Sequence, residues 1–228
     1  MSEVRVKKSV ALSGVVAGDT ALSTVGHTGN DLHYRGYEIN DLAQNCEFEE
    51  VAYLILYGEL PTKAQLRDYK AQLSKLRDLP DQVKTILENL PKTAHPMDVV
   101  RTATSALGSF YPEDEKHDAQ SALLAANRLI AASPSALLYW YHFSHFGKKI
   151  TLSSDADGVA EHFLQLFLQE KPKQSWVKAM QASLILYAEH EFNASTFTAR
   201  VIAGTGSDIY SSITGAMLAT NCTCCCFG

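Results

Sequence analysis

The chain has no surplus of positive charge. Its 20 lysines and arginines are outnumbered by 25 acidic residues and are spread evenly along 228 positions, which gives a net charge of -5. Nucleic-acid-binding proteins gather basic residues into a patch or stripe that faces the phosphate backbone. The sequence therefore argues against a nucleic-acid partner. Its 46% apolar and 20% charged residues are typical of an ordinary globular protein.

Long apolar runs are missing as well. The N-terminal stretch "MSEVRVKKSVALSGVV" has too short an apolar run for a secretory signal peptide. No later run approaches the roughly 20 consecutive apolar residues of a membrane span. These two absences predict a cytoplasmic protein without a membrane partner.

Cysteine is nearly missing until the end of the chain. Cys46 stands alone, whereas Cys222, Cys224, Cys225 and Cys226 fall within the last seven residues. Their spacing lacks the two C-x2-C pairs of a typical zinc site. Cys225 is fourth from the end, as in prenylated proteins, but the residues after it depart from the prenylation motif. We expect neither a metal nor a lipid on this cysteine-rich tail.

Alternation of strands and helices is also absent, which argues against a parallel sheet. Strand character is confined to residues 10–38, where "TALSTV" and "DLHYRGYEI" flank the turn signals Gly26, Gly29 and Asn30. This pattern predicts a small β-hairpin. Arg35, between two tyrosines, is expected to be a structural arginine in a turn.

Helical periodicity and capping signals cover the rest of the chain. Helices are predicted at 46–58, 61–76, 95–108, 121–132, 135–146, 157–169, 175–191, 195–203 and 207–217. Gly58 is expected to end the first of them, while Pro96 begins and Gly108 ends the third. The helices at 135–146 and 175–191 are apolar on nearly all sides, so we expect them in a large core or a subunit interface. The predicted fold class is all-α with a small N-terminal hairpin.

Common catalytic motifs are weak. "AGTGSD", from Ala203 to Asp208, neither follows a strand nor leads to Gly-Lys-Ser/Thr, so we interpret it as a turn between helices rather than a phosphate loop. His142 and His145 share a helical face, but no carboxylate or cysteine nearby completes a metal site. We expect them to pack among aromatic residues, and no metal site is predicted.

The stretch "YAEHEFNASTFTAR", residues 187–200, is unusually polar for its surroundings. His190 is predicted at the C-terminal end of a buried helix between Glu189 and Glu191, where the acidic neighbours and the helix end favour a protonated imidazole. Asn193 and Ser195 are expected to cap the next helix or to donate at the same place. From these residues alone, His190 is either a structural histidine or a ligand for an anion.

A longer comparison favours the second alternative. "AEHEFNASTFTARVIAGTGSDIYSSITGA" resembles the substrate-histidine segment of the citrate synthase superfamily. "KKSVALSGVVAGDTALSTVG", "DLHYRGYEINDLA", "FEEVAYLILYGELPT", "HPMDVVRT" and "LLYWYHFSH" resemble its 2-methylcitrate synthase branch in particular. The resemblance runs over residues 7–216.

This resemblance implies a large helical domain and a helix-packed homodimer. It also implies an acyltransferase of propionate catabolism, which condenses propanoyl-CoA with oxaloacetate and water to give 2-methylcitrate and free CoA. The acyl-CoA thioester is a substrate, and no cofactor or metal is implied. The family histidine that holds oxaloacetate falls on His190, Asn193 lies beside it in the same motif, and Tyr187 matches a position near the acyl pocket.

The resemblance stops after Ala216. The family continues with a Gly-Pro-x-His-Gly-Gly segment that carries a catalytic histidine, whereas this chain reads "MLATNCTCCCFG". The resemblance implies that the second catalytic histidine, the carboxylate base, the CoA-binding loops and the substrate arginines lie further on, in a small catalytic domain. We therefore expect residues 1–216 to be part of the large domain, residues 217–228 to be a tail foreign to the family, and no catalytic residue to lie in this chain.

Two classes of function remain open on the sequence. The chain is either a truncated 2-methylcitrate synthase, inactive alone, or a non-catalytic helical module that pairs with full-length subunits. Within the enzyme class, a fragment of a citrate synthase that uses acetyl-CoA is the alternative.

Overall fold

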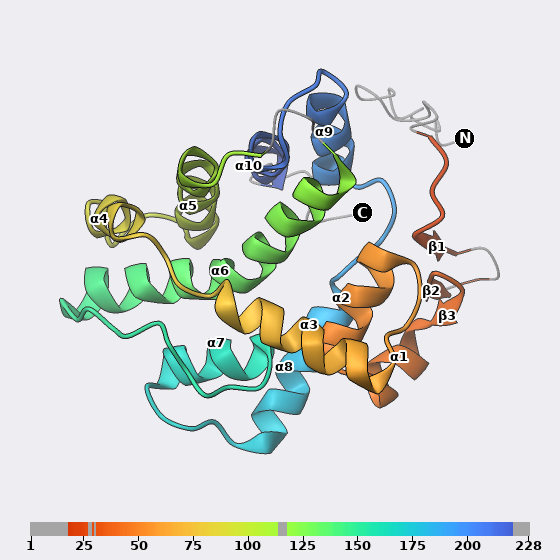
Figure 1. Cartoon of the computed structure of the whole chain (residues 1–228), viewed down its shortest axis with the longest axis horizontal. Helices are drawn as coiled ribbons and strands as arrows, with labels where there is room; N and C mark the ends of the chain where they lie inside the picture. Colours follow the sequence, from red (N-terminus) through yellow and green to blue (C-terminus); the bar gives the residue numbers. More distant parts are fainter. Residues whose placement is uncertain (1–17, 27–28, 30, 114–117, 221–228) are drawn as a thin grey trace, which may run out of the picture.

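The computed structural model describes residues 18–26, 29, 31–113 and 118–220. Over these residues the chain forms ten helices and one small sheet (Figure 1). The strands are β1 (Ser23–Val25), β2 (Leu32–Tyr34) and β3 (Tyr37–Glu38), and the helices are α1 (Ile39–Asn45), α2 (Phe48–Tyr57), α3 (Lys63–Lys75), α4 (Asp81–Glu88), α5 (Pro96–Phe110), α6 (Ala119–Phe146), α7 (Val159–Leu168), α8 (Gln174–Leu186), α9 (Ala194–Ala203) and α10 (Ile209–Thr220). The predicted helical fold class is confirmed.

The sheet is a three-stranded antiparallel meander in the order β1-β2-β3. Ser23 of β1 lies opposite Tyr34 of β2. A tight turn at Arg35 and Gly36 adds β3, so the sheet has one strand more than the predicted hairpin. Arg35 takes the left-handed conformation (φ 51°) and donates from its guanidinium to the carbonyl oxygen of Ile55 at 3.3 Å. It is the structural arginine that the sequence predicts.

Helix α6 runs through the middle of the molecule (Figure 1). The sequence predicts two helices, 121–132 and 135–146, and this is wrong, because α6 continues through Pro134. A proline inside a helix removes one hydrogen bond and costs about 3 kcal/mol. Both halves of α6 bury residues in the same core, among them Leu129 and Tyr139, and this burial outweighs the break.

Helix α6 is also long and apolar enough, by length and composition, to cross a membrane, with a mean hydropathy of 1.2 in its apolar window. Half of that window is buried inside the protein. Helices α4, α5 and α7 pack against it. This is the pattern of the core helix of a folded domain.

Helix α5 does not end at Gly108, as the sequence predicts, but continues to Phe110. Gly108 instead lets α10 approach closely, since a Cβ atom at this position would lie 2.7 Å from the Cβ atom of Tyr210. By contrast, Gly58 ends α2 in the left-handed conformation and Pro96 begins α5, as predicted. The glycine at 108 serves helix packing rather than helix termination.

The C-terminal ends of helices α8 and α10 also differ from the sequence prediction. Helix α8 ends at Leu186, so residues 187–191 are not helical. Helix α10 extends to Thr220, which makes the first four residues of the predicted tail part of a helix. The cysteines at 222–226 lie outside the described residues. "AGTGSD" forms a turn between α9 and α10, as predicted.

Candidate functional site

The connection between α8 and α9 carries the predicted substrate-binding residues. It is held by Tyr34 of β2, which is fully buried. The Tyr34 hydroxyl donates to the carbonyl oxygen of Ile185 at 3.0 Å and accepts from the backbone N–H of Glu189 at 3.2 Å. Burial raises the pKa of this hydroxyl, and the Glu189 carboxylate adds to the rise. In an uninterrupted α8, the backbone N–H of Glu189 would donate to the carbonyl oxygen of Ile185. Tyr34 bonds to both groups instead, and the chain leaves the helix here.

Asn193 joins His190 to the start of α9. Its Oδ1 accepts from the backbone N–H of Thr196 and from the hydroxyl of Ser195, each at 2.7 Å, and so caps the helix. Its Nδ2 lies 2.8 Å from Nε2 of His190. Because an amide NH2 group can only donate, Nε2 is the acceptor, and the ring is a neutral imidazole with its hydrogen on Nδ1. Asn193 thus both caps α9 and donates to His190, which are the two alternatives that the sequence leaves open.

The two glutamates beside His190 point elsewhere. Glu189 accepts through Oε1 from the buried hydroxyl of Ser23 at 3.2 Å, and Glu191 accepts through Oε1 from the backbone N–H of Val25 at 3.2 Å. Both carboxylates therefore accept hydrogen bonds from β1. The sequence predicts instead that these two acids favour a protonated His190. The reason is tertiary, since β1 supplies donors from a distant part of the chain.

Tyr187 lies apart from this group. It follows the last residue of α8, and its side chain is 88% exposed. Within the described ranges, no hydrogen bond or ring contact joins it to His190 or Asn193. The structure thus brings together two of the three predicted substrate-binding residues.

The other candidates are structural. Nε2 of His142 lies 2.9 Å from the carbonyl oxygen of Leu166, and His145 packs edge-on against Trp140, as predicted for aromatic packing. In the part of the chain that the structure describes, no group of three or more histidine, cysteine or acidic residues could hold a metal ion.

A buried carboxylate lies elsewhere in the molecule. Glu49 of α2 is fully buried, and its Oε1 accepts from the backbone N–H of Val159 at 2.6 Å. Burial raises its pKa. A Cβ atom on Gly158 would lie only 2.7 Å from Glu49, so no substrate reaches this carboxylate from that side. Glu49 holds the start of α7 and is not a candidate base.

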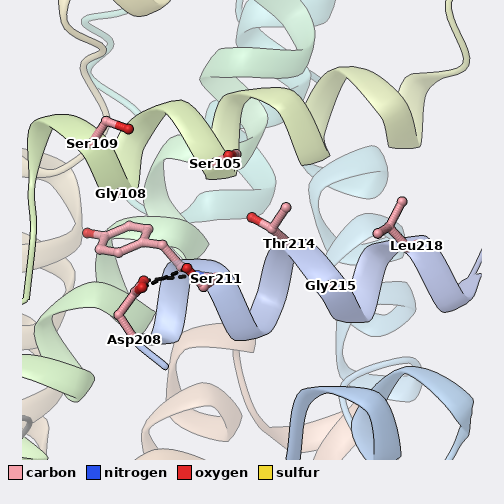
Figure 2. A pocket seen from close by; sticks show the side chains of 9 residues that line it. Ser105, Gly108, Ser109, Asp208, Ser211, Thr214, Gly215 and Leu218 are labelled. Carbon is pink, nitrogen blue, oxygen red and sulfur yellow. Dashed lines mark hydrogen bonds between the residues drawn. The ribbon is translucent and has the colours of Figure 1, made fainter. Parts of the chain in front are cut away.

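A hollow of about 480 Å³ lies between α5 and α10 (Figure 2). It is lined by Ser105, Gly108, Ser109, Asp208, Tyr210, Ser211, Thr214, Gly215 and Leu218. Its carboxylate, Asp208, already accepts from the hydroxyl of Ser211 at 2.6 Å and from the backbone N–H of Ser211 at 2.9 Å. Among the described residues, no histidine or cysteine lines it. Its chemistry is therefore that of helix capping and packing, and the His190 connection is the better candidate site.

Comparison with known proteins shows the family to which this site belongs. The family model described as "Citrate synthase, C-terminal domain" matches residues 11–223, which include the whole His190 connection and both flanking helices. The chain belongs to the citrate synthase family. This confirms the resemblance found in the sequence.

Individual relatives of this citrate synthase family member extend the comparison. The 2-methylcitrate synthase of Shewanella oneidensis is 53% identical over 217 residues, which are 95% of this chain and 57% of that protein. The crystal structure of citrate synthase from Pyrobaculum aerophilum matches with a TM-score of 0.84 and 33% identity, over 94% of this chain and 55% of that one. Citrate synthase from Thermoplasma acidophilum was solved as a ternary complex with carboxymethyl coenzyme A and oxaloacetate. It matches with a TM-score of 0.83 and 32% identity, over 91% of this chain and 54% of that one.

The chain spans about half the length of the curated relatives it matches. The mainly helical architecture is thus part of the citrate synthase fold.

Sequence reasoning overlooked the supports of the candidate site. Tyr34 and Ser23 lie in the hairpin region, where the sequence pattern indicates only turn residues and the structural Arg35. The pair of glutamates around His190 is the one sequence feature that indicates these supports, because two neighbouring carboxylates need hydrogen-bond donors from another part of the chain. Helical periodicity carries no information that these donors lie in β1.

Proposed function

We propose that this chain is part of a 2-methylcitrate synthase, which condenses propanoyl-CoA with oxaloacetate and water to give 2-methylcitrate and CoA. The observation that carries the proposal is the 53% identity to the Shewanella oneidensis 2-methylcitrate synthase. We further propose a cytoplasmic homodimer of propionate catabolism that needs no metal or prosthetic group.

The proposed chemistry needs three positioned groups. A carboxylate removes a proton from the carbon next to the thioester carbonyl, a histidine donates to the thioester oxygen as the enol forms, and a second histidine polarises the ketone of oxaloacetate. The enol carbon then bonds to the ketone carbon, and water cleaves the thioester to release CoA. We assign all three groups to the part of the relatives' length that this chain does not span.

The role that we assign to His190 and Asn193 is to hold oxaloacetate. Asn193 donates to Nε2 of His190, which leaves Nδ1–H as the donor for an anionic substrate. Oxaloacetate carries two carboxylates and a ketone, all of which accept hydrogen bonds. The Thermoplasma acidophilum citrate synthase, which binds oxaloacetate, supports this substrate class. Tyr187 is assigned to the acyl side of the site, where its exposed ring is free to contact a group that the rest of the enzyme brings near.

This assignment limits what the chain can do alone. A hydrogen bond to a charged acceptor contributes only about 1.5 to 3 kcal/mol net, so oxaloacetate binds weakly. Holding one substrate does not stabilise a transition state, so no turnover is expected.

The test follows free CoA release from propanoyl-CoA and oxaloacetate, with acetyl-CoA as the competing substrate. The 228-residue chain should be inactive. A fusion of residues 1–216 to the remaining part of the Shewanella oneidensis relative should be active and should prefer propanoyl-CoA. In that fusion His190→Ala should raise the KM for oxaloacetate and lower kcat, because the ketone is misplaced. Robust turnover by the chain alone contradicts the proposal, and a preference for acetyl-CoA favours a citrate synthase instead.

A second function is favoured by a different observation. Large apolar side chains lie exposed on several helices, among them Phe146, Trp176, Leu186, Val201 and Leu218. Where exposed apolar side chains form a contiguous patch, the patch is typical of protein interfaces. The chain would then be a non-catalytic module that pairs with full-length subunits. Co-expression with the tagged Shewanella oneidensis relative tests this function: a module should form a stoichiometric mixed complex with the relative, and the absence of that complex would contradict it.

A further inference from the structure

We propose that Glu189 and Glu191 are positioning residues that fix the orientation of the His190 ring by tying its loop to the N-terminal sheet. The inference rests on the proposed function, in which His190 holds oxaloacetate. It assigns the two acids a role opposite to the electrostatic one that their sequence positions suggest. The contacts of Glu189 and Glu191 with Ser23, Val25 and Tyr34 are called the loop brace below.

The brace fixes the chain on both sides of His190. Before it, Glu189 is held twice, because its backbone N–H donates to Tyr34 and its Oε1 accepts from the hydroxyl of Ser23. After it, Glu191 is held at its side chain by the backbone N–H of Val25. His190 is thus exposed to solvent but lies between two anchored residues.

The backbone between the anchors is in an uncommon conformation. Glu191 has φ 68°, in the left-handed region that residues with a side chain rarely adopt. Such a conformation persists where the surroundings determine it. Here the backbone N–H of Glu191 donates to Oε1 of Glu189 at 2.5 Å, and the carbonyl oxygen of Glu191 accepts from the backbone N–H of Asn193 at 3.0 Å. The Glu189 carboxylate therefore holds the turn as well as the sheet, while the Glu191 carboxylate holds the sheet.

The turn has a direct effect on the histidine ring. It folds the chain so that the Asn193 side chain reaches back to Nε2 of His190 at 2.8 Å. This contact sets the ring orientation and places the hydrogen on Nδ1. In the residues that the structure describes, Nδ1 has no protein partner, so it remains available to a ligand. A looser turn would release Nε2 from Asn193 and let the ring rotate and change tautomer.

The experiment reads the tautomer of His190 directly, in the 228-residue chain labelled with ¹⁵N-histidine. Long-range proton–nitrogen correlation spectra distinguish Nδ1–H from Nε2–H, and a His190→Gln variant assigns the His190 signals among the eight histidines. The variants are Glu189→Ala, Glu191→Ala and Glu191→Gln, which keeps a carbonyl acceptor for Val25. The matched control is Glu59→Ala, because Glu59 is an exposed glutamate after α2 without a hydrogen bond to other described residues. Oxaloacetate is then titrated into each.

The wild-type chain, Glu191→Gln and Glu59→Ala should show the Nδ1–H form. Glu189→Ala and Glu191→Ala should show a mixture of tautomers and an apparent Kd for oxaloacetate at least fivefold higher, with a circular dichroism spectrum like that of the wild type. An unchanged His190 tautomer in both alanine variants overturns the inference. If oxaloacetate leaves the His190 signals of the wild-type chain unmoved, the proposed function fails, and the tautomer comparison still decides whether the brace orients His190.

Discussion

Nδ1 of His162 lies 2.8 Å from the hydroxyl oxygen of Ser154, and no part of His162 is exposed. Its Nε2 lies 3.0 Å from the hydroxyl of Ser135, which is also fully buried. Burial lowers the pKa of His162 to about 3, and the nearby positive charge of Arg77 adds to the fall. His162 of α7 is therefore a neutral histidine locked between α6 and the connection that precedes α7.

This contact predicts acid sensitivity. The folded-state pKa of about 3 lies below the unfolded value of 6.5. The unfolded chain thus takes up a proton first, and the stabilisation present above pH 6.5 is lost as the pH falls toward 3. The loss is at most about 1.4 kcal/mol per pH unit, or roughly 2 kcal/mol between pH 6.5 and 5. Urea unfolding at several pH values measures it. His162→Gln should be less stable at pH 7.5 but should lose less stability on acidification; an equal slope in both proteins would contradict the assignment.

The packing of α5 and α9 on α10 predicts different consequences for two glycines inside helices. Alanine favours a helix over glycine by about 1 kcal/mol, so propensity alone predicts that Gly108→Ala and Gly215→Ala both stabilise the protein. A Cβ atom at 108 would lie 2.7 Å from the Cβ atom of Tyr210, which cannot move without its backbone. At 215 the close atom is Cδ1 of Ile202, the end of a flexible side chain.

Gly108→Ala should therefore destabilise the protein by about 1 to 3 kcal/mol, the usual range for overpacking, whereas Gly215→Ala should change stability much less. Thermal and urea unfolding of the two variants provide the comparison. Equal effects would show that the backbone contact at Tyr210 does not limit how closely α5 and α10 approach.

The double role of Asn193 predicts that its two functions can be separated. Asn193→Asp keeps an oxygen for the N-cap of α9, so stability should stay within about 0.5 kcal/mol of the wild type. A carboxylate cannot donate to Nε2 of His190, so the histidine should change to its Nε2–H form and oxaloacetate should bind more weakly. Asn193→Ala should lose both functions and about 0.5 to 2 kcal/mol of stability. Unfolding curves and histidine NMR spectra measure the two effects; an unchanged tautomer in Asn193→Asp would refute the donor role.

The exposed apolar side chains predict self-association. Phe146 at the end of α6 is 65% exposed, and Trp176 and Val201 are each about half exposed. Exposed apolar surface promotes association. The purified chain should be oligomeric or poorly soluble in light scattering, and Phe146→Ser with Val201→Ser should reduce its apparent mass. A monodisperse wild-type monomer would count strongly against this prediction.

Sequence reasoning placed the candidate site at His190 and Asn193 but described its surroundings incorrectly. The sequence predicts a helix over residues 187–191, because Leu186 and Tyr187 continue the pattern of α8. Tyr34 ends that pattern from another part of the fold, at a separation of 155 residues from Glu189. The sequence predicts that the two acids act on His190, their nearest neighbour in sequence, yet their partners are Ser23 and Val25.

Four features could be predicted from the sequence alone: the helical class, the N-terminal strands, the caps at Gly58 and Pro96, and the family. These features follow from local periodicity, from turn chemistry and from motifs that can be read within a few residues of one another. Tertiary structure alone decided that α6 continues through Pro134, that Gly108 packs rather than ends a helix, and that α8 stops at Leu186. Each of these features depends on contacts with a segment that is distant in the sequence. Such contacts produce no periodic pattern in the sequence.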